Sequence, residues 1–260
     1  MADIFLETTA VIDLVFGDKQ TKSGLRAHIP EDSKVLTSQY VIYEVNRGFL
    51  RYLRLLHNKS FQLTRFSEIF GFLGAIHRQP SYVGAVVNSM QRYFQANHPT
   101  LSDADRLIHF RGYLRREIRR GFPRVPKAAE AFINDIGCRE AGQPYEDDLG
   151  LYQQPLDMHL CGKYQTCGLK EYAHANRTDL KKTRDKLLEI KNPDPETTAR
   201  IKYLRELYRV PKRDFPRSAC FRSSDALIVH ETPSEYVILT KNKIHIEPIC
   251  QVLGKKGDYF

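Results

Sequence analysis

Short apolar runs and helical patterns alternate at both ends of the chain, and this alternation is the strongest constraint on its fold. Residues 3–6, DIFL, predict a strand, and a helical pattern follows near residues 9–16. SKVLTS at 33–38 predicts a second strand, and a long helix is expected from Gln39 into the mid-fifties. Near the other end, a helix over ALIVHE leads through a turn into the strand YVILT. Strands that alternate with helices predict an α/β fold with a largely parallel sheet.

The middle of the chain has a different pattern. Apolar residues at 60–77 and 82–94 recur with helical spacing. Ser102 and Asp105 form a capping-box pattern at the start of another helix, and Asp194 is expected to cap a later one. The middle of the chain is therefore expected to be mainly helical.

These two patterns predict how the chain divides into domains. The simplest arrangement is one discontinuous α/β domain formed by residues 1–58 and 212–260. Residues 59–211 would then be a mainly helical, basic insertion within it.

Composition limits the class of protein. Hydrophobic residues make up 42% of the chain, enough for a packed core. No apolar run approaches the roughly 20 residues that span a bilayer. The first residues carry acids but no base before Lys19, which is the wrong charge for a signal or transit peptide. Five cysteines at irregular spacings favour reduced thiols. We therefore expect a soluble, intracellular, cytoplasmic protein that makes no membrane contact.

Four polar residues stand near the ends of the expected strands and helices. Glu7 follows the first strand, Glu44 lies in the second helix, Asp225 opens a late helix, and Asn242 follows YVILT. Each alone has an ordinary explanation as a helix cap, a surface acid or a turn residue. However, the carboxyl ends of strands are where open α/β sheets bind ligands. Together, the four residues predict one site.

The stretches that hold these residues are ETTAVIDLV, SQYVIYEV, SSDALIVHE and ILTKNKIH. In kind and order they resemble the motifs of the PIN-domain nucleases, over residues 3–54 and 217–257. The resemblance implies a PIN-like, three-layer α/β/α fold with a mostly parallel central sheet and a large helical insertion. Two positions depart from the family pattern, since Glu7 and Asn242 stand where the family has aspartates.

The same resemblance implies a metal-dependent endoribonuclease, a hydrolase that leaves a 5′-phosphate and a 3′-hydroxyl on RNA. Glu7, Glu44 and Asp225 would bind Mg²⁺ or Mn²⁺, because these hard cations prefer oxygen ligands. Asn242 would complete the catalytic set as a neutral ligand or by positioning water. The alternative is a catalytically degenerate PIN-like scaffold that binds RNA or a regulatory protein partner, because Asn242 brings no charge. DNA is a second candidate substrate, since no feature of the sequence separates it from RNA.

A basic stretch at 110–127 indicates nucleic acid as a partner. It holds seven arginine or lysine residues and only one acidic residue, in a chain of net charge +9. A solvated helix face is the ordinary explanation for such a run, but few acids here can pair with the arginines, and rows of arginine bind phosphate backbones. The predicted nucleic-acid-binding residues are Arg111, Arg115, Arg116, Arg119, Arg120, Arg124 and, from a second basic cluster, Arg213.

Four residues of metal-binding types gather within 16 residues: His159, Cys161, Cys167 and His174. Histidine and cysteine are the ligands of structural zinc sites, so this cluster is a candidate Zn²⁺ site. The two cysteines lack the short spacing of most zinc motifs. Ordinary buried thiols are therefore the competing explanation.

Overall fold

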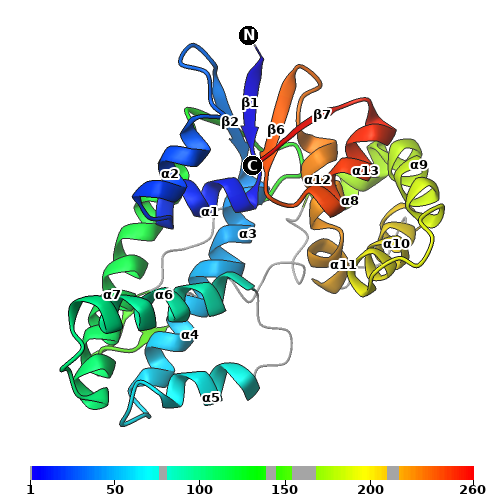
Figure 1. Cartoon of the computed structure of the whole chain (residues 1–260). Helices are drawn as coiled ribbons and strands as arrows, with labels where there is room; N and C mark the ends of the chain where they lie inside the picture. The colour runs from blue at the N-terminus through cyan, green and yellow to red at the C-terminus, as the bar shows by residue number, and fades with distance from the viewer. Residues whose placement is uncertain (1, 76–80, 139–144, 154–167, 210–216) are drawn as a thin grey trace. The chain divides into compact units, whose positions relative to one another are not determined.

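The chain forms two compact units, which we describe separately (Figure 1). Our computed structural model describes residues 2–75, 81–138, 145–153, 168–209 and 217–260. The α/β unit comprises Met1–Tyr43, Lys127–Ala141 and Leu156–Phe260, and the helical unit comprises Glu44–Pro126 and Gly142–Pro155.

The α/β unit contains a five-stranded sheet in which all strands are parallel and helices flank the sheet (Figure 1). The strands, in chain order, are β1 (Asp3–Leu6), β2 (Val35–Ser38), β3 (Ala131–Ile133), β6 (Tyr236–Thr240) and β7 (Lys256–Tyr259). Their order across the sheet is β3-β2-β1-β6-β7. The predicted α/β fold with a parallel sheet is therefore confirmed.

Strands β1 and β6 form the centre of the sheet because their side chains are apolar on both faces. Phe5 and Leu6 in β1, and Ile238 and Leu239 in β6, are all fully buried. A parallel strand covered on both faces needs such a continuous apolar run, whereas a half-exposed strand alternates apolar and polar residues. In the ladder, Phe5 pairs with Leu36 on one side and Ile238 on the other.

The helices of the α/β unit begin largely where the sequence indicates. Asp194 caps α10, because its Oδ1 accepts hydrogen bonds from the amides of Glu196 and Thr197 at 2.8 and 3.0 Å. The helices are α1 (Thr8–Phe16), α2 (Lys19–Arg26), α3 (Gln39–Val45, which runs into the helical unit), α8 (Leu169–Ala175), α9 (Arg177–Leu188), α10 (Pro195–Arg209), α11 (Arg217–Arg222), α12 (Ser224–Glu231) and α13 (Lys243–Leu253).

The division into units differs from the predicted boundaries. Strand β3 and helices α8 to α10 lie within the stretch that we expected to form the insertion, but they belong to the α/β unit. Strand β3 belongs to this unit because it pairs in parallel with β2. A strand of three residues, two of them exposed, has no clear alternating pattern and is difficult to predict from sequence.

The helical unit continues the long helix expected from Gln39. A π-helical segment, η1 (Asn46–Leu50), connects α3 to α4 (Arg51–Ser60). Helices α5 (Glu68–Ala75), α6 (Ser81–Asn97) and α7 (Asp103–Arg124), the turn η2 (Val125–Lys127) and a hairpin of β4 (Tyr145–Glu146) and β5 (Tyr152–Gln153) follow.

Helix α7 begins with the expected capping box. The Ser102 hydroxyl accepts from the Asp105 amide at 3.1 Å and donates to the Asp105 carboxylate at 2.6 Å. Beneath it, the rings of Phe66, Phe94 and Phe110 pack edge to face in the core of this unit. Across the described residues, no helix has the length and apolar character needed to cross a membrane.

Candidate functional site

The strand order creates a topological switch point between β1 and β6. From β1 the chain builds outward to β2 and β3 on one side, while β6 and β7 lie on the other. In open α/β sheets, ligands bind at the carboxyl ends of the strands at such a point. Glu7 directly follows β1, and Thr240 is the last residue of β6. The switch point is thus where the sequence predicts a site.

Glu7 joins the ends of these two central strands. Its carboxylate Oε2 accepts hydrogen bonds from the Thr9 amide at 2.9 Å, the Thr9 hydroxyl at 2.7 Å and the Thr240 hydroxyl at 2.9 Å. Its own amide donates to the Leu239 carbonyl at 3.2 Å. Glu7 therefore caps α1, and it also reaches across to β6. Only 2% of its surface is exposed.

Asp225 occupies the first turn of α12 and is also buried, with 8% of its surface exposed. Its Oδ2 is paired with the guanidinium of Arg200 on α10 and accepts a hydrogen bond from the side-chain amide of Asn242 at 3.3 Å. A single carboxylate oxygen thus receives both a cation and an amide donor.

A chain of hydrogen bonds links three of the four predicted residues. The Thr240 hydroxyl donates to Glu7 and accepts from the Asn242 amide at 2.9 Å, and the Asn242 side chain donates to Asp225. Each predicted residue comes from a different element: the end of β1, the start of α12 and the turn after β6. The structure therefore brings Glu7, Asn242 and Asp225 together.

The fourth predicted residue, Glu44, lies in the last turn of α3 and is half-buried. It is the first residue of the helical unit, while the other three belong to the α/β unit. Its role as the third metal-binding carboxylate stays a prediction.

Two basic residues near Asp225, an arginine and a histidine, were not predicted from the sequence. Arg200 has only 4% of its surface exposed. Its Nε and Nη1 are buried and have no hydrogen-bond partner within the described part of the chain. The sequence did contain a signal: Arg200 stands on the inward stripe of α10 that also holds Thr197, Leu204 and Leu207. An arginine on such a stripe requires a buried anion.

His245, in the first turn of α13, is the second unpredicted residue. Its Nδ1 lies 3.7 Å from Asp225 Oδ2 and 3.7 Å from Glu196 Oε2, and its Nε2 lies 3.5 Å from Asp194 Oδ2. These distances exceed those of good hydrogen bonds but allow charge attraction when the imidazole is protonated. His245 therefore lies between Asp225 and the start of α10.

The available ligands are of the kind that Mg²⁺ and Mn²⁺ prefer. Carboxylate oxygens of Glu7 and Asp225 and the amide oxygen of Asn242 are hard donors. However, nowhere in the described ranges do three or more His, Cys, Asp or Glu side chains form a group placed to hold a metal ion. The α/β unit by itself thus supplies two carboxylates and one amide, with the charge of one carboxylate balanced by Arg200.

The predicted arginines of α7 fall into two groups. Arg111 donates to the carbonyls of Ser60 and Leu63 at 2.5 and 3.2 Å. Arg115 and Arg119 bind the two carboxylate oxygens of Glu146 at 2.7 and 2.5 Å. These three side chains hold the helical unit together.

Glu146 is the anion that ties Arg115 and Arg119. Its burial acts to raise the pKa, but the hydrogen bonds from Arg119 and Arg115 outweigh this, and the pKa lies below its ordinary value. The same contact raises the pKa of Arg119. Arg116, Arg120 and Arg124 project from α7 as exposed side chains, while Arg213 falls outside the described residues.

The proposed zinc cluster falls mostly on residues that the structure does not describe. His159, Cys161 and Cys167 lie outside the described ranges, and His174 is exposed in the last turn of α8. The zinc site stays a prediction.

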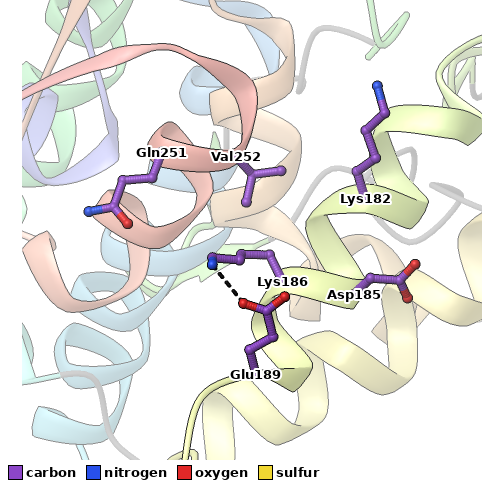
Figure 2. A pocket seen from close by; sticks show the side chains of 6 residues that line it. All are labelled: Lys182, Asp185, Lys186, Glu189, Gln251 and Val252. Atoms are coloured by element: carbon purple, nitrogen blue, oxygen red, sulfur yellow. Dashed lines mark hydrogen bonds and ion pairs between the residues drawn. The ribbon is translucent and has the colours of Figure 1, made fainter.

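An open hollow of about 550 Å³ lies between α9 and α13 (Figure 2). Its lining is Lys182, Asp185, Lys186, Glu189, Gln251 and Val252, and Lys186 pairs with Glu189 at 2.6 Å. Gln251 and Val252 are in the last turns of α13, at the opposite end of the helix from His245. The hollow carries charges of both signs and contains none of the predicted site residues.

No protein-family model, curated protein or solved structure matches the chain.

Proposed function

We propose that this protein is a metal-dependent endoribonuclease whose α/β unit is PIN-like. The observation that carries the proposal is the hydrogen-bonded chain of Glu7, Thr240, Asn242 and Asp225 at the switch point of a parallel sheet. Glu7 comes from the start of the chain and Asp225 and Asn242 from near its end, and the three converge at the edge of the sheet where α/β proteins bind ligands. The all-parallel sheet flanked by helices is the architecture that the motif resemblance implies.

Glu7 and Asp225 would hold the Mg²⁺ or Mn²⁺, with Asn242 as a further oxygen ligand. The bound ion would polarise the phosphoryl oxygen and lower the pKa of its water. Thr240 orients Glu7, and Asn242 orients Asp225, through the hydrogen bonds described above.

A second candidate function is an RNA-binding scaffold that does not cleave. Two observations favour it: Asn242 brings no charge, and Arg200 already balances Asp225. A site with less net negative charge attracts a divalent cation less strongly.

The test is cleavage of a 5′-labelled single-stranded RNA with Mn²⁺ or Mg²⁺, compared with the same reaction in EDTA. We would compare the wild type with Glu7→Gln and Asp225→Asn. Glu189→Gln is the matched control, because it removes an exposed carboxylate at the C-cap of α9, outside the site. We expect Glu7→Gln to cut at least about 100-fold more slowly, a loss on the scale of one electrostatic contact to the transition state, and the control to cut normally.

The outcomes separate the candidates. Metal-independent cutting, or equal cutting by Glu7→Gln and the wild type, would refute the proposed site. RNA binding without any cutting would support the scaffold. Cutting of single-stranded DNA alone would change the substrate and leave the site intact.

A further inference from the structure

Helix α7 carries arginines on two different faces, and only one face is used inside the protein. One face, which we call the tied stripe, consists of Arg111, Arg115 and Arg119. These side chains bind carbonyls and the Glu146 carboxylate of the same unit. These guanidinium groups already have oxygen partners, so they are poorly suited to bind an external phosphate as well.

The second face, which we call the open stripe, is His109, Tyr113, Arg116, Arg120 and Arg124. Their spacing of three or four residues places them on one side of the helix. The stripe is about 22 Å long at 1.5 Å per residue. Arg120 and Arg124 make no ion pair within the described ranges, and Arg116 has only its sequence neighbour Glu117 at 3.5 Å.

Aromatic and imidazole rings continue the open stripe at its N-terminal end. The rings of His98 and His109 stack at 6.1 Å with 17° between their planes, and Tyr93 lies edge-on to His98 at 5.4 Å. Tyr93 is 48% exposed, although its ring is large and mostly apolar. Further along α7, the guanidinium of Arg116 lies 5.6 Å from the centre of the half-buried Tyr113 ring.

We propose that the open stripe binds single-stranded RNA. Arg116, Arg120 and Arg124 contact successive phosphates, and unpaired bases stack on the rings of Tyr93 and His109. Exposed cations that track a backbone, next to exposed rings, are the usual means of binding single strands, because every base offers a flat face. A duplex keeps its bases stacked inside and can use only the arginines.

The choice of RNA rests on the proposed function, whereas the choice of a single strand rests on the rings beside the arginines. An acidic protein surface would match the arginines equally well but would make no particular use of stacked, exposed rings. The mixture of both features on one helix face is what favours a single strand.

The test is equilibrium binding of a labelled 20-nucleotide single-stranded RNA in EDTA across a range of NaCl concentrations. Arg116→Ala with Arg120→Ala removes two cations from the open stripe. Arg115→Ala with Arg119→Ala removes two cations from the tied stripe of the same helix. The two double variants have equal net charge, so any difference between them reflects position.

We expect the open-stripe variant to lower the slope of log Kd against log salt by about 1.4, because each phosphate contact on a single strand contributes about 0.7. The tied-stripe variant should keep the wild-type slope but melt at a lower temperature. Tyr93→Ala should weaken binding about 5- to 150-fold, the loss of one stacked base, with no change in slope.

The proposal is overturned by an unchanged slope in the open-stripe variant, by an equal loss of slope in the tied-stripe variant, or by duplex RNA bound as tightly as the single strand. A wild type that binds no RNA would also overturn it. Because Arg116 is 51% exposed, the open-stripe variant should fold, and Arg116→Gln with Arg120→Gln provides a second version. Binding is measured in EDTA and needs no cleavage. The binding test of the open stripe and the cleavage test of the proposed function can therefore give opposite answers.

Discussion

Replacing Asp225 with asparagine removes the charge that balances a buried arginine. The two side chains are 11% and 5% exposed, and the guanidinium of Arg200 is paired with Oδ2 of Asp225. Asparagine preserves the shape of the side chain but not its charge. Arg200 would then be a buried cation without a counter-ion.

The expected loss of stability follows from this burial. Removing one partner of a buried ion pair typically costs about 3–5 kcal/mol, because the other charge stays desolvated. At about 2–4 °C per kcal/mol for a protein of this size, Asp225→Asn should melt about 6–20 °C below the wild type. Glu7→Gln should cost only about 1 kcal/mol, since the Thr9 and Thr240 groups that donate to its Oε2 are neutral and an amide oxygen can still accept from them.

A double-variant cycle tests this reasoning. Arg200→Met removes the uncompensated cation, and apolar replacement of buried ion pairs is often neutral or stabilising. In urea unfolding, the double variant with Asp225→Asn should therefore be more stable than Asp225→Asn alone. The reasoning is refuted if Asp225→Asn melts within 2 °C of the wild type, or if adding Arg200→Met lowers stability further. For the cleavage test, Asp225→Asn must be assayed below its melting temperature.

Three further predictions concern the stability of the α/β unit. Burial raises the pKa of Glu231 to about 7. The free energy of unfolding of the wild type should therefore fall by about 3 kcal/mol as the pH rises from 4.5 to 7. Urea unfolding should show that Glu231→Gln removes this fall. At Asp194 burial acts to raise the pKa, but hydrogen bonds from Thr197 outweigh it and lower the pKa to about 2. The wild type should therefore lose stability as the pH falls from 3.8 to 2, and Asp194→Asn should lack this pH-dependent loss. An unchanged acid unfolding profile in the variant would contradict this. Lys255 donates to three carbonyls at the end of α12; Lys255→Met should cost about 2 kcal/mol in thermal unfolding, whereas Lys256→Met, in an exposed neighbour, should cost little.

Local signals predicted the elements that carry the candidate site. The apolar run before Glu7 forms β1, and the run before Asn242 forms β6. Asp194 caps α10 as expected. Such features depend on residues within one or two turns of each other, which is why they can be recognised without knowledge of the rest of the fold.

Long-range features could not be predicted in the same way. Strand β3 is defined by its pairing with β2, which lies about 95 residues earlier in the chain. The pairing of Arg200 with Asp225 also depends on how α10 packs against its neighbours. The arginines of α7 look equivalent in the sequence, and it is Glu146, from a hairpin beyond the helix, that pairs with Arg115 and Arg119 on one face.

The sequence by itself therefore determined the type and order of the central strands and helices, and it identified the residues at the ends of β1, α12 and β6. Only the tertiary structure decided that Glu7, Asn242 and Asp225 form one hydrogen-bonded chain, and that a buried arginine balances Asp225. The physical reason is that strand formation and helix capping depend on neighbouring residues. Burial and charge pairing depend instead on side chains that the fold brings together from distant parts of the chain.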